Sequence, residues 1–223
     1  MLHKTQGIVI KYIKYGDTSI IVNIFTEVFG LQTYIVNGVR SKKSKGKIAF
    51  YQPLTLLEMV VYHKNQSNIH RISEVKCSEP ITSISTNIKK SCIALFLTEV
   101  IHKTIKEQED VKDLFTFLHK SILILEYLEN NYENFHVQFL LKLTQYLGFG
   151  ADKIEDSELG LMLDKELLAT CSSLYTSPFD ASIKITYHSR QTLLHCMIDY
   201  YQNHIDAFGT IKSAEILSEV LQG

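Results

Sequence analysis

The strongest chemical signal in this 223-residue sequence is a run of positive charge between residues 40 and 47. Serines and a glycine separate its five cations, which are Arg40, Lys42, Lys43, Lys45 and Lys47. Because a segment of this composition has no apolar side chains to bury, we expect an exposed, mobile loop. Each Lys or Arg that neutralises a phosphate releases counterions, which gives salt-dependent affinity for nucleic acid of any sequence. The run therefore indicates a nucleic-acid-binding loop, and the alternative is a solvated charged segment without a partner.

Positive and negative charges are unevenly distributed along the chain. The net charge is −1 overall, but residues 1–80 carry +6 and residues 81–223 carry −7. This asymmetry indicates a polyanion partner for the basic part, so Lys11 and Lys14 are also candidate nucleic-acid-binding residues. The aromatic rings near the basic run are those of Tyr12, Tyr15, Phe25, Tyr34, Phe50, Tyr51 and Tyr62. Some of these rings can stack on unpaired bases, but most must fill the core.

Residue patterns typical of enzymes and metal sites are missing from the sequence. It contains no glycine-rich phosphate loop, no HExxH and no nucleophile elbow. We interpret Ser189 as a helix cap and Cys196 as a core thiol, because neighbouring helix positions do not face each other. The cysteines are widely spaced, at Cys77, Cys92, Cys171 and Cys196. We therefore expect no catalytic residue, no metal and no cofactor, and we expect His63 and His70, which flank a turn, to be solvated.

The first part of the chain has the pattern of short strands separated by turns. Runs rich in β-branched and aromatic residues occupy residues 7–13, 19–26, 31–36, 54–62 and 69–75. The turn signal Gly16-Asp17 separates the first two runs, and Asn37-Gly38 follows the third. Five strands joined by short turns and one longer basic connection predict a five-stranded OB-type β-barrel.

After Pro80 the apolar residues recur with helical spacing, which predicts a mainly α-helical region. The fold class is therefore α+β and multi-domain, with an OB-fold domain over residues 1–80 and a helical domain over residues 81–223. The helical spacing is lost over about residues 150–182, an irregular insert for which a small hairpin and helical turns both stay open. No apolar run reaches the roughly 18 residues of a membrane span, and no secretory signal is visible, so we expect a cytoplasmic protein without a membrane partner.

A series of short motifs occurs in order along nearly the whole chain. They are GIVI at 7–10, YGDTS at 15–19, FTE at 25–27, FG at 29–30, NGVR at 37–40, QPL at 52–54, FLLKL at 139–143, LGF at 147–149, FGTIKS at 208–213 and IL at 216–217. In this ordered set the chain resembles the RecO family of bacterial recombination mediators. No single motif is as specific as a Walker sequence.

The resemblance implies a non-catalytic DNA repair protein of the RecFOR pathway. Such proteins bind single- and double-stranded DNA and anneal complementary strands. They act with RecR, and often RecF, to load RecA onto DNA coated with single-strand-binding protein (SSB). Many members carry a four-cysteine zinc module, but here only Cys171 lies between Gly148 and Tyr187. A zinc site is therefore not expected.

The resemblance also implies binding of the acidic-hydrophobic C-terminal tail of SSB. An acidic peptide that ends in a Phe carboxylate needs an apolar slot and a cation. The candidate cations are Lys142, Arg190 and Lys212, each of which has the alternative of an ordinary structural or solvated role. Two other interpretations of the chain stay open: an RNA-binding or ribosome-associated OB-fold protein, and an acidic helical scaffold whose barrel assists solubility.

Overall fold

The computed structural model describes residues 1–41, 44, 46–64, 67–105 and 111–222. The chain forms two compact units, and neither is one continuous segment. The first contains Met1–Thr82 and Ile105–Ile122, and the second contains Ser83–Thr104 and Leu123–Gly223. The sequence predicted a single division near residue 80, whereas a later helical segment also belongs to the first unit.

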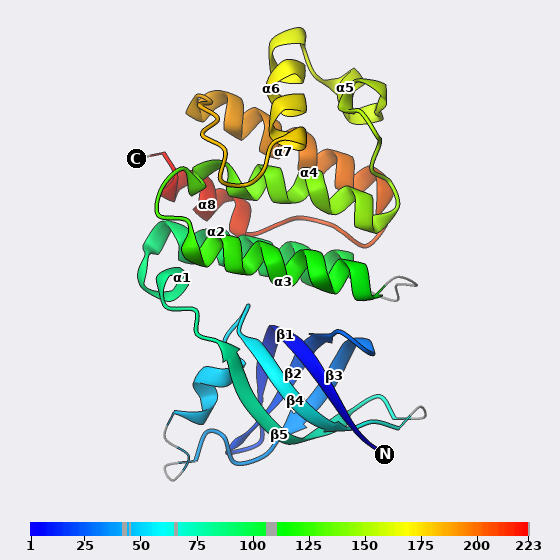
Figure 1. Ribbon diagram of the computed structural model, residues 1–223, viewed down its shortest axis with the longest axis vertical. Helices are drawn as coiled ribbons and strands as arrows, with labels where there is room; N and C mark the ends of the chain where they lie inside the picture. Colours follow the sequence, from blue (N-terminus) through cyan, green and yellow to red (C-terminus); the bar gives the residue numbers. More distant parts are fainter. Residues whose placement is uncertain (42–43, 45, 65–66, 106–110, 223) are drawn as a thin grey trace. The chain divides into compact units, whose positions relative to one another are not determined.

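The first unit is built around a closed five-stranded β-barrel (Figure 1). Its strands are β1 (Leu2–Tyr15), β2 (Ser19–Thr26), β3 (Gly30–Val36), β4 (Leu56–Tyr62) and β5 (His70–Glu79). The strands are ordered β1-β2-β3-β5-β4 around the barrel, and only the pairing of β3 with β5 is parallel. This mixed barrel with a Greek-key path confirms the predicted OB-type fold.

Strand β1 belongs to both halves of the barrel because it is long enough to pair twice. Its first half pairs with β4 and its second half with β2, and the register shifts between Val9 and Lys11. A Cβ at Gly7 would lie 2.5 Å from the Met59 methyl carbon and 2.7 Å from Cγ2 of Ile24. Glycine is therefore required where β1 crosses the core, because a larger residue would displace both neighbours.

The inward-facing residues of all strands fill the barrel. Val9, Ile24, Tyr34 and Val61 have no exposed surface. Alternate residues of each strand point to opposite sides, so burial of this set leaves the intervening residues on the outside. The short 3-10 helix η1 (Lys47–Tyr51) adds the buried ring of Tyr51 to the same core.

Two histidines at one end of the barrel differ from the sequence-based expectation. His70 is only 5% exposed and His63 is half-buried, whereas both were expected to be solvated. The expectation was wrong because both imidazoles stack in an aromatic cluster with the Phe29 ring.

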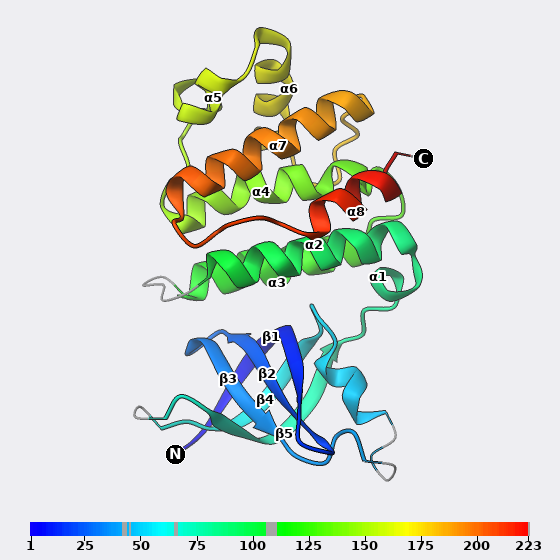
Figure 2. The same ribbon diagram turned by 180° about the vertical axis from the view of Figure 1, so that it is seen from behind.

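The rest of the described chain is helical (Figure 2). The helices are α1 (Ser83–Thr86), α2 (Ile88–Thr104), α3 (Val111–Tyr127), α4 (Phe135–Leu147), α5 (Glu158–Met162), α6 (Lys165–Thr176), α7 (Tyr187–His204) and α8 (Ser213–Val220), with 3-10 turns η2 (Tyr132–Asn134) and η3 (Ile154–Asp156). In the second unit, α4 packs against α6 and α7, and α8 packs against α2. Phe139 and Tyr201 are buried in its core, where the Tyr201 hydroxyl donates a 2.8 Å hydrogen bond to the Leu140 carbonyl oxygen.

Residues 150–182, for which a small hairpin and helical turns both stayed open, contain the short turn η3 and the helices α5 and α6. Helix α5 begins after Ser157, whose Oγ accepts a hydrogen bond from the Gly160 NH. Helix α6 begins after Asp164, whose carboxylate accepts hydrogen bonds from the NH groups of Glu166 and Leu167. Helix α5 has only five residues, which are too few to show a helical period.

Two further expectations about single residues need correction. Helix α7 is capped by Thr186, whose Oγ1 accepts a 3.1 Å hydrogen bond from the Ser189 NH, so Ser189 lies inside the helix. Cys196 is half-buried, whereas Cys171 is fully buried, which raises the pKa of its thiol to about 12. No helix in the described part of the chain is long and apolar enough to cross a bilayer.

Candidate nucleic-acid interface

Arg40, the first cation of the basic run, is attached to the turn between β1 and β2. Its guanidinium Nη1 lies 3.1 Å from the Gly16 carbonyl oxygen and 3.3 Å from that of Ser19, and donates to both. Its backbone NH donates a 2.9 Å hydrogen bond to the Thr18 carbonyl oxygen. These contacts hold the start of the basic run next to the β1–β2 turn, so Arg40 has a structural role in addition to its charge.

The rest of the basic run is partly described. Lys42, Lys43 and Lys45 lie outside the described residues. Lys47 is exposed and forms the first residue of η1. Ser44, which lies within the basic run, has its hydroxyl oxygen 2.7 Å from the Gly38 carbonyl oxygen, to which it can donate a hydrogen bond. The end of the run is therefore a short 3-10 helix with its cation directed to solvent.

Lys11 and Lys14 are both exposed, but they lie on opposite faces of β1. Lys11 pairs with Asn23 of β2, on the outer face of the sheet. Lys14 pairs with Ile20, whose side chain points into the barrel. The structure therefore places only Lys11 on the outer face that β1 shares with β2 and β3.

A row of directly paired residues crosses all five strands on the outside of the barrel. Ile13 pairs with Ile21, and Ile21 with Ile35. Ile35 then pairs with Arg71, and Arg71 with Tyr62. Ile13 and Tyr62 are 56% and 49% exposed, and Arg71 is exposed as well. We call these five residues the cross-strand row.

The cross-strand row has side chains suited to single-stranded nucleic acid. Apolar and aromatic surface can cover the faces of unpaired bases, and an Arg guanidinium can hold a phosphate. Tyr15 lies two residues beyond Ile13 on the same face of β1 and pairs with Ser19, whose carbonyl oxygen accepts from Arg40. The basic run therefore begins beside the row.

The structure separates the aromatic side chains that fill the barrel from those that face solvent. The rings of Tyr12, Tyr34, Phe50 and Tyr51 lie inside or against the barrel core, and the buried Phe25 ring stacks against Phe115 of α3. Tyr15 and Tyr62 are 52% and 49% exposed, respectively. Only these two rings of the original set are therefore placed to stack on bases.

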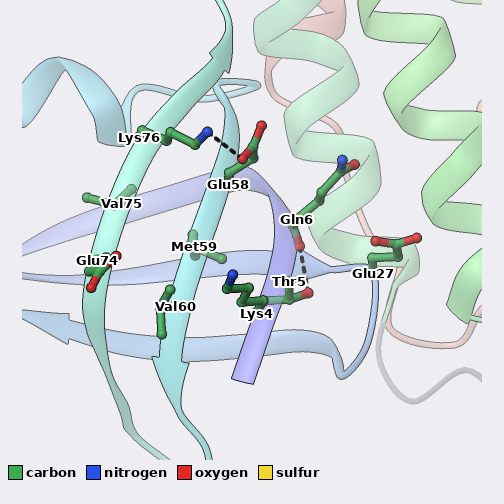
Figure 3. A pocket seen from close by; sticks show the side chains of 10 residues that line it. All are labelled: Lys4, Thr5, Gln6, Glu27, Glu58, Met59, Val60, Glu74, Val75 and Lys76. Carbon is green, nitrogen blue, oxygen red and sulfur yellow. Dashed lines mark hydrogen bonds and ion pairs between the residues drawn. The ribbon is translucent and has the colours of Figure 1, made fainter. Parts of the chain in front are cut away.

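A second surface of the barrel is hollowed but has the wrong charge for phosphate (Figure 3). The hollow has a volume of about 500 Å³ and lies over β1, β4 and β5. Its carboxylates, from Glu27, Glu58 and Glu74, outnumber its ammonium groups, from Lys4 and Lys76. The Lys76 ammonium is also paired with the Glu58 carboxylate at 2.7 Å. Repulsion between carboxylates and phosphates makes this hollow a poor nucleic-acid site.

Two of the three candidate cations for an acidic tail donate hydrogen bonds within the second unit. The Lys142 ammonium donates a 2.7 Å hydrogen bond to the Tyr175 carbonyl oxygen and lies 5.7 Å from the centre of the Phe179 ring. Partial burial lowers the pKa of Lys142. Arg190 donates to Asn134 Oδ1 at 3.3 Å, and the Asn134 amide in turn donates to the Ile183 carbonyl oxygen. Lys142 therefore combines a cation with an adjacent ring, as an aromatic carboxylate ligand requires.

The third candidate cation, Lys212, lies at the start of α8 and is exposed. Its backbone NH donates a 3.0 Å hydrogen bond to Oε1 of Glu99, and the Ser213 NH donates to Oε2 of the same carboxylate at 2.9 Å. Glu99 thus takes the capping role at α8, and the Lys212 side chain is not needed for it. Lys142 and Arg190 donate hydrogen bonds through their side chains, whereas Lys212 donates through its backbone NH. Among the described residues, no hydrogen bond connects Lys212 with Lys142 or Arg190.

The sequence analysis did not identify Ile13, Ile21, Ile35 and Arg71 as surface residues that could contact a ligand. A usable signal existed, because apolar residues at outward positions of an alternating strand leave unpartnered apolar surface. Recognising that signal requires the strand register, which the shift between Val9 and Lys11 changes by one position. Within the described ranges, no three His, Cys, Asp or Glu side chains are arranged to hold a metal ion.

The strand order and the parallel β3–β5 pair define a protein of the OB-barrel class with a helical C-terminal region. The family model described as "Recombination protein O N terminal" matches residues 1–81, and the model described as "Recombination protein O C terminal" matches residues 85–160. The chain belongs to the RecO family of DNA repair proteins.

Full-length similarity to curated proteins agrees with this assignment. The chain is 40% identical to the DNA repair protein RecO of Flavobacterium psychrophilum, over 97% of this chain and 98% of the relative. It is 36% identical to that of Flavobacterium johnsoniae, over 97% and 98% of the two chains. The corresponding protein of Bacteroides fragilis is 34% identical over 99% of both chains. The similarity therefore includes the barrel and the helical region together.

Proposed function

We propose that this chain is a non-catalytic recombination mediator that binds single- and double-stranded DNA through its barrel. The observation that carries the proposal is the cross-strand row, which lies beside the basic run on the barrel of a RecO-family chain. Cations of the run bind the phosphates of either form, and the row contacts the bases of single strands. Phosphate contacts supply affinity without sequence preference, which suits a repair protein that meets any DNA sequence.

The proposed activity is annealing of complementary strands and, together with RecR, loading of RecA on SSB-coated DNA. Annealing needs no catalytic residue. It requires neutralised phosphates, because two strands repel each other, and it requires release of the paired product. The cations reduce this repulsion, and the apolar row loses its contact with bases once they pair and stack in the duplex.

Annealing of fluorescent complementary oligonucleotides tests this function. Two exposed cations of β5 form a matched pair, since Arg71 lies in the cross-strand row and Lys76 lies in the hollow beside Glu58. Arg71→Ala should slow annealing and weaken binding of single strands about three- to tenfold, the loss expected for one charged contact. Lys76→Ala should leave both unchanged.

Equal effects of Arg71→Ala and Lys76→Ala on annealing and binding would show that the cross-strand row does not contact DNA. Competition with structured RNA distinguishes the alternative function, because an RNA-binding or ribosome-associated protein would prefer the RNA. A DNA repair protein should retain its single-stranded DNA in that competition.

The proposed partner surface for the SSB tail lies in the second unit. Lys142 beside the Phe179 ring supplies the cation and ring contact for a terminal Phe carboxylate, and Arg190 and Lys212 supply further positive charge. Because Lys142 is hydrogen-bonded and half-buried, Lys142→Met is preferable to a charge reversal: it keeps the apolar stem and removes the charge.

Fluorescence anisotropy with an SSB-tail peptide tests this surface. Lys142→Met and Lys212→Glu should each weaken peptide binding about three- to tenfold and leave strand annealing intact. Lys165→Glu is the matched control, because Lys165 is an exposed lysine of the same unit outside the proposed surface. If all three variants bind the peptide as the wild type does, the tail binds elsewhere.

A further inference from the structure

Three histidines form an aromatic cluster at one end of the barrel. The His63 ring is stacked between two others: its centre is 4.0 Å from that of Phe29, at an interplanar angle of 8°, and 4.5 Å from that of His70, at 21°. His3 packs edge-on against Phe29, with ring centres 5.2 Å apart. The cluster therefore joins three parts of the chain that lie far apart in the sequence: β1, the β2–β3 turn, and the residues that follow β4 and begin β5.

Backbone hydrogen bonds attach the N-terminus to the same cluster. The Met1 ammonium donates to the His63 carbonyl oxygen at 3.3 Å, and the His63 NH donates to the Met1 carbonyl oxygen at 3.2 Å. The side-chain Nδ1 of His63 is buried and has no hydrogen-bond partner among the described residues, as is the case for the hydroxyl of Tyr34 beside His70. No group within the described ranges thus stabilises a proton on His63 Nδ1.

The charges that surround the cluster are mostly positive. The Met1 ammonium and Lys64 lie next to His63 in space or sequence, and Arg71 follows His70. Glu27, the carboxylate on the β2–β3 turn, lines the hollow of Figure 3 together with Lys4. Among the described residues, none of the ion pairs involves His3, His63 or His70. A proton added to the cluster therefore meets repulsion without a compensating carboxylate.

We propose that His3, His63 and His70 form a proton-sensitive latch, which holds the N-terminus and the residues next to His63 and His70 against the barrel when neutral and releases them on mild acidification. Neutral imidazoles stack favourably on each other and on Phe29. Two protonated imidazoles at the His63–His70 separation would repel each other strongly. The latch does not rest on the proposed DNA binding. Tyr62 and Arg71 of the cross-strand row nevertheless lie directly beside His63 and His70 in the sequence.

The direction of the pH effect follows from the shifted titration of His63. Burial lowers its pKa below the ordinary value of 6.5, and the positive charges of His70, His3 and the N-terminus lower it further. The unfolded or released state therefore binds the proton more readily. The stabilisation of the closed latch by neutral His63 is fully present above pH 6.5 and is lost as the pH falls below that value.

Hydrogen exchange of the intact chain, measured by mass spectrometry and corrected for intrinsic rates, tests the latch. Between about pH 7.5 and pH 5.5, wild-type protection should fall several-fold more in residues 1–5 and 67–70 than it falls in His63→Phe, because only the wild type can take up a proton at this position when these residues are released. The Phe variant keeps a stacked ring that cannot be protonated. His188→Gln, a change at an exposed histidine of α7, should behave as the wild type does.

Equal loss of protection in the wild type and His63→Phe would overturn the latch. A second measurement covers the case in which the Phe variant fails to fold. In the wild type, the His63 imidazole proton resonance should titrate below the ordinary histidine value of 6.5. Titration of His63 at or above that value would contradict the proposal as well.

Discussion

At the scale of single residues, Arg40 differs from the lysines that follow it in the basic run. Its guanidinium satisfies two backbone carbonyl oxygens next to the β1–β2 turn, whereas Lys47 is exposed. A hydrogen bond from a charged donor contributes more to stability than a solvated charge does. From the sequence alone, Arg40 and Lys47 are equivalent candidate phosphate ligands, because the sequence does not show which carbonyl oxygens lie near each side chain.

This difference predicts unequal effects on stability. Arg40→Ala should lower the free energy of unfolding by about 1–2 kcal/mol, because two carbonyl oxygens lose a charged donor at a partly exposed site. Lys47→Ala should change it by less than about 0.5 kcal/mol. Urea denaturation of both variants measures these changes. A stability loss that is the same for both would mean that the contacts of Arg40 contribute nothing measurable.

At the scale of elements, the barrel was predictable from alternation, whereas α5 and α6 were not predicted. Their start signals are present in the sequence, since Ser157 and Asp164 are favoured capping residues followed by an acidic residue within two positions. Helix α5 is too short for periodicity to confirm it. The stacking of His63 on Phe29 was also beyond prediction, because it joins residues that are far apart in the sequence.

The helical structure of this segment leads to a prediction about metal. Cys171 is fully buried in α6, and burial raises its thiol pKa to about 12, so the thiolate that zinc requires is disfavoured. Purified protein should contain no stoichiometric zinc by elemental analysis, and a chelator should leave its melting temperature unchanged. About one zinc per chain would contradict this account and would direct attention to the histidines.

At the scale of the whole molecule, charge asymmetry and the order of motifs identified the family without structural data. The structure then supplied what composition does not contain, namely which side chains share a face. Ile13, Ile21 and Ile35 form a row because the register shift in β1 places their strands in that alignment. Lys11 and Lys14 belong to the same basic part of the sequence, but the pleat of β1 separates them.

The salt dependence of single-stranded DNA binding tests the central claim most directly. Each lost phosphate contact should reduce the slope of log affinity against log salt by about 0.7. Lys42, Lys43, Lys45 and Lys47 should be changed together to Ala, leaving Arg40 in place for stability. Control lysines are exposed ones away from the barrel strands, changed in the same way: Lys120, Lys153, Lys165 and Lys184. The account predicts weaker binding and a flatter slope only when the four lysines of the basic run are changed, equally for oligonucleotides of different sequence. An unchanged affinity and slope in that variant, or equal changes in the control, would contradict the claim that the basic run binds DNA.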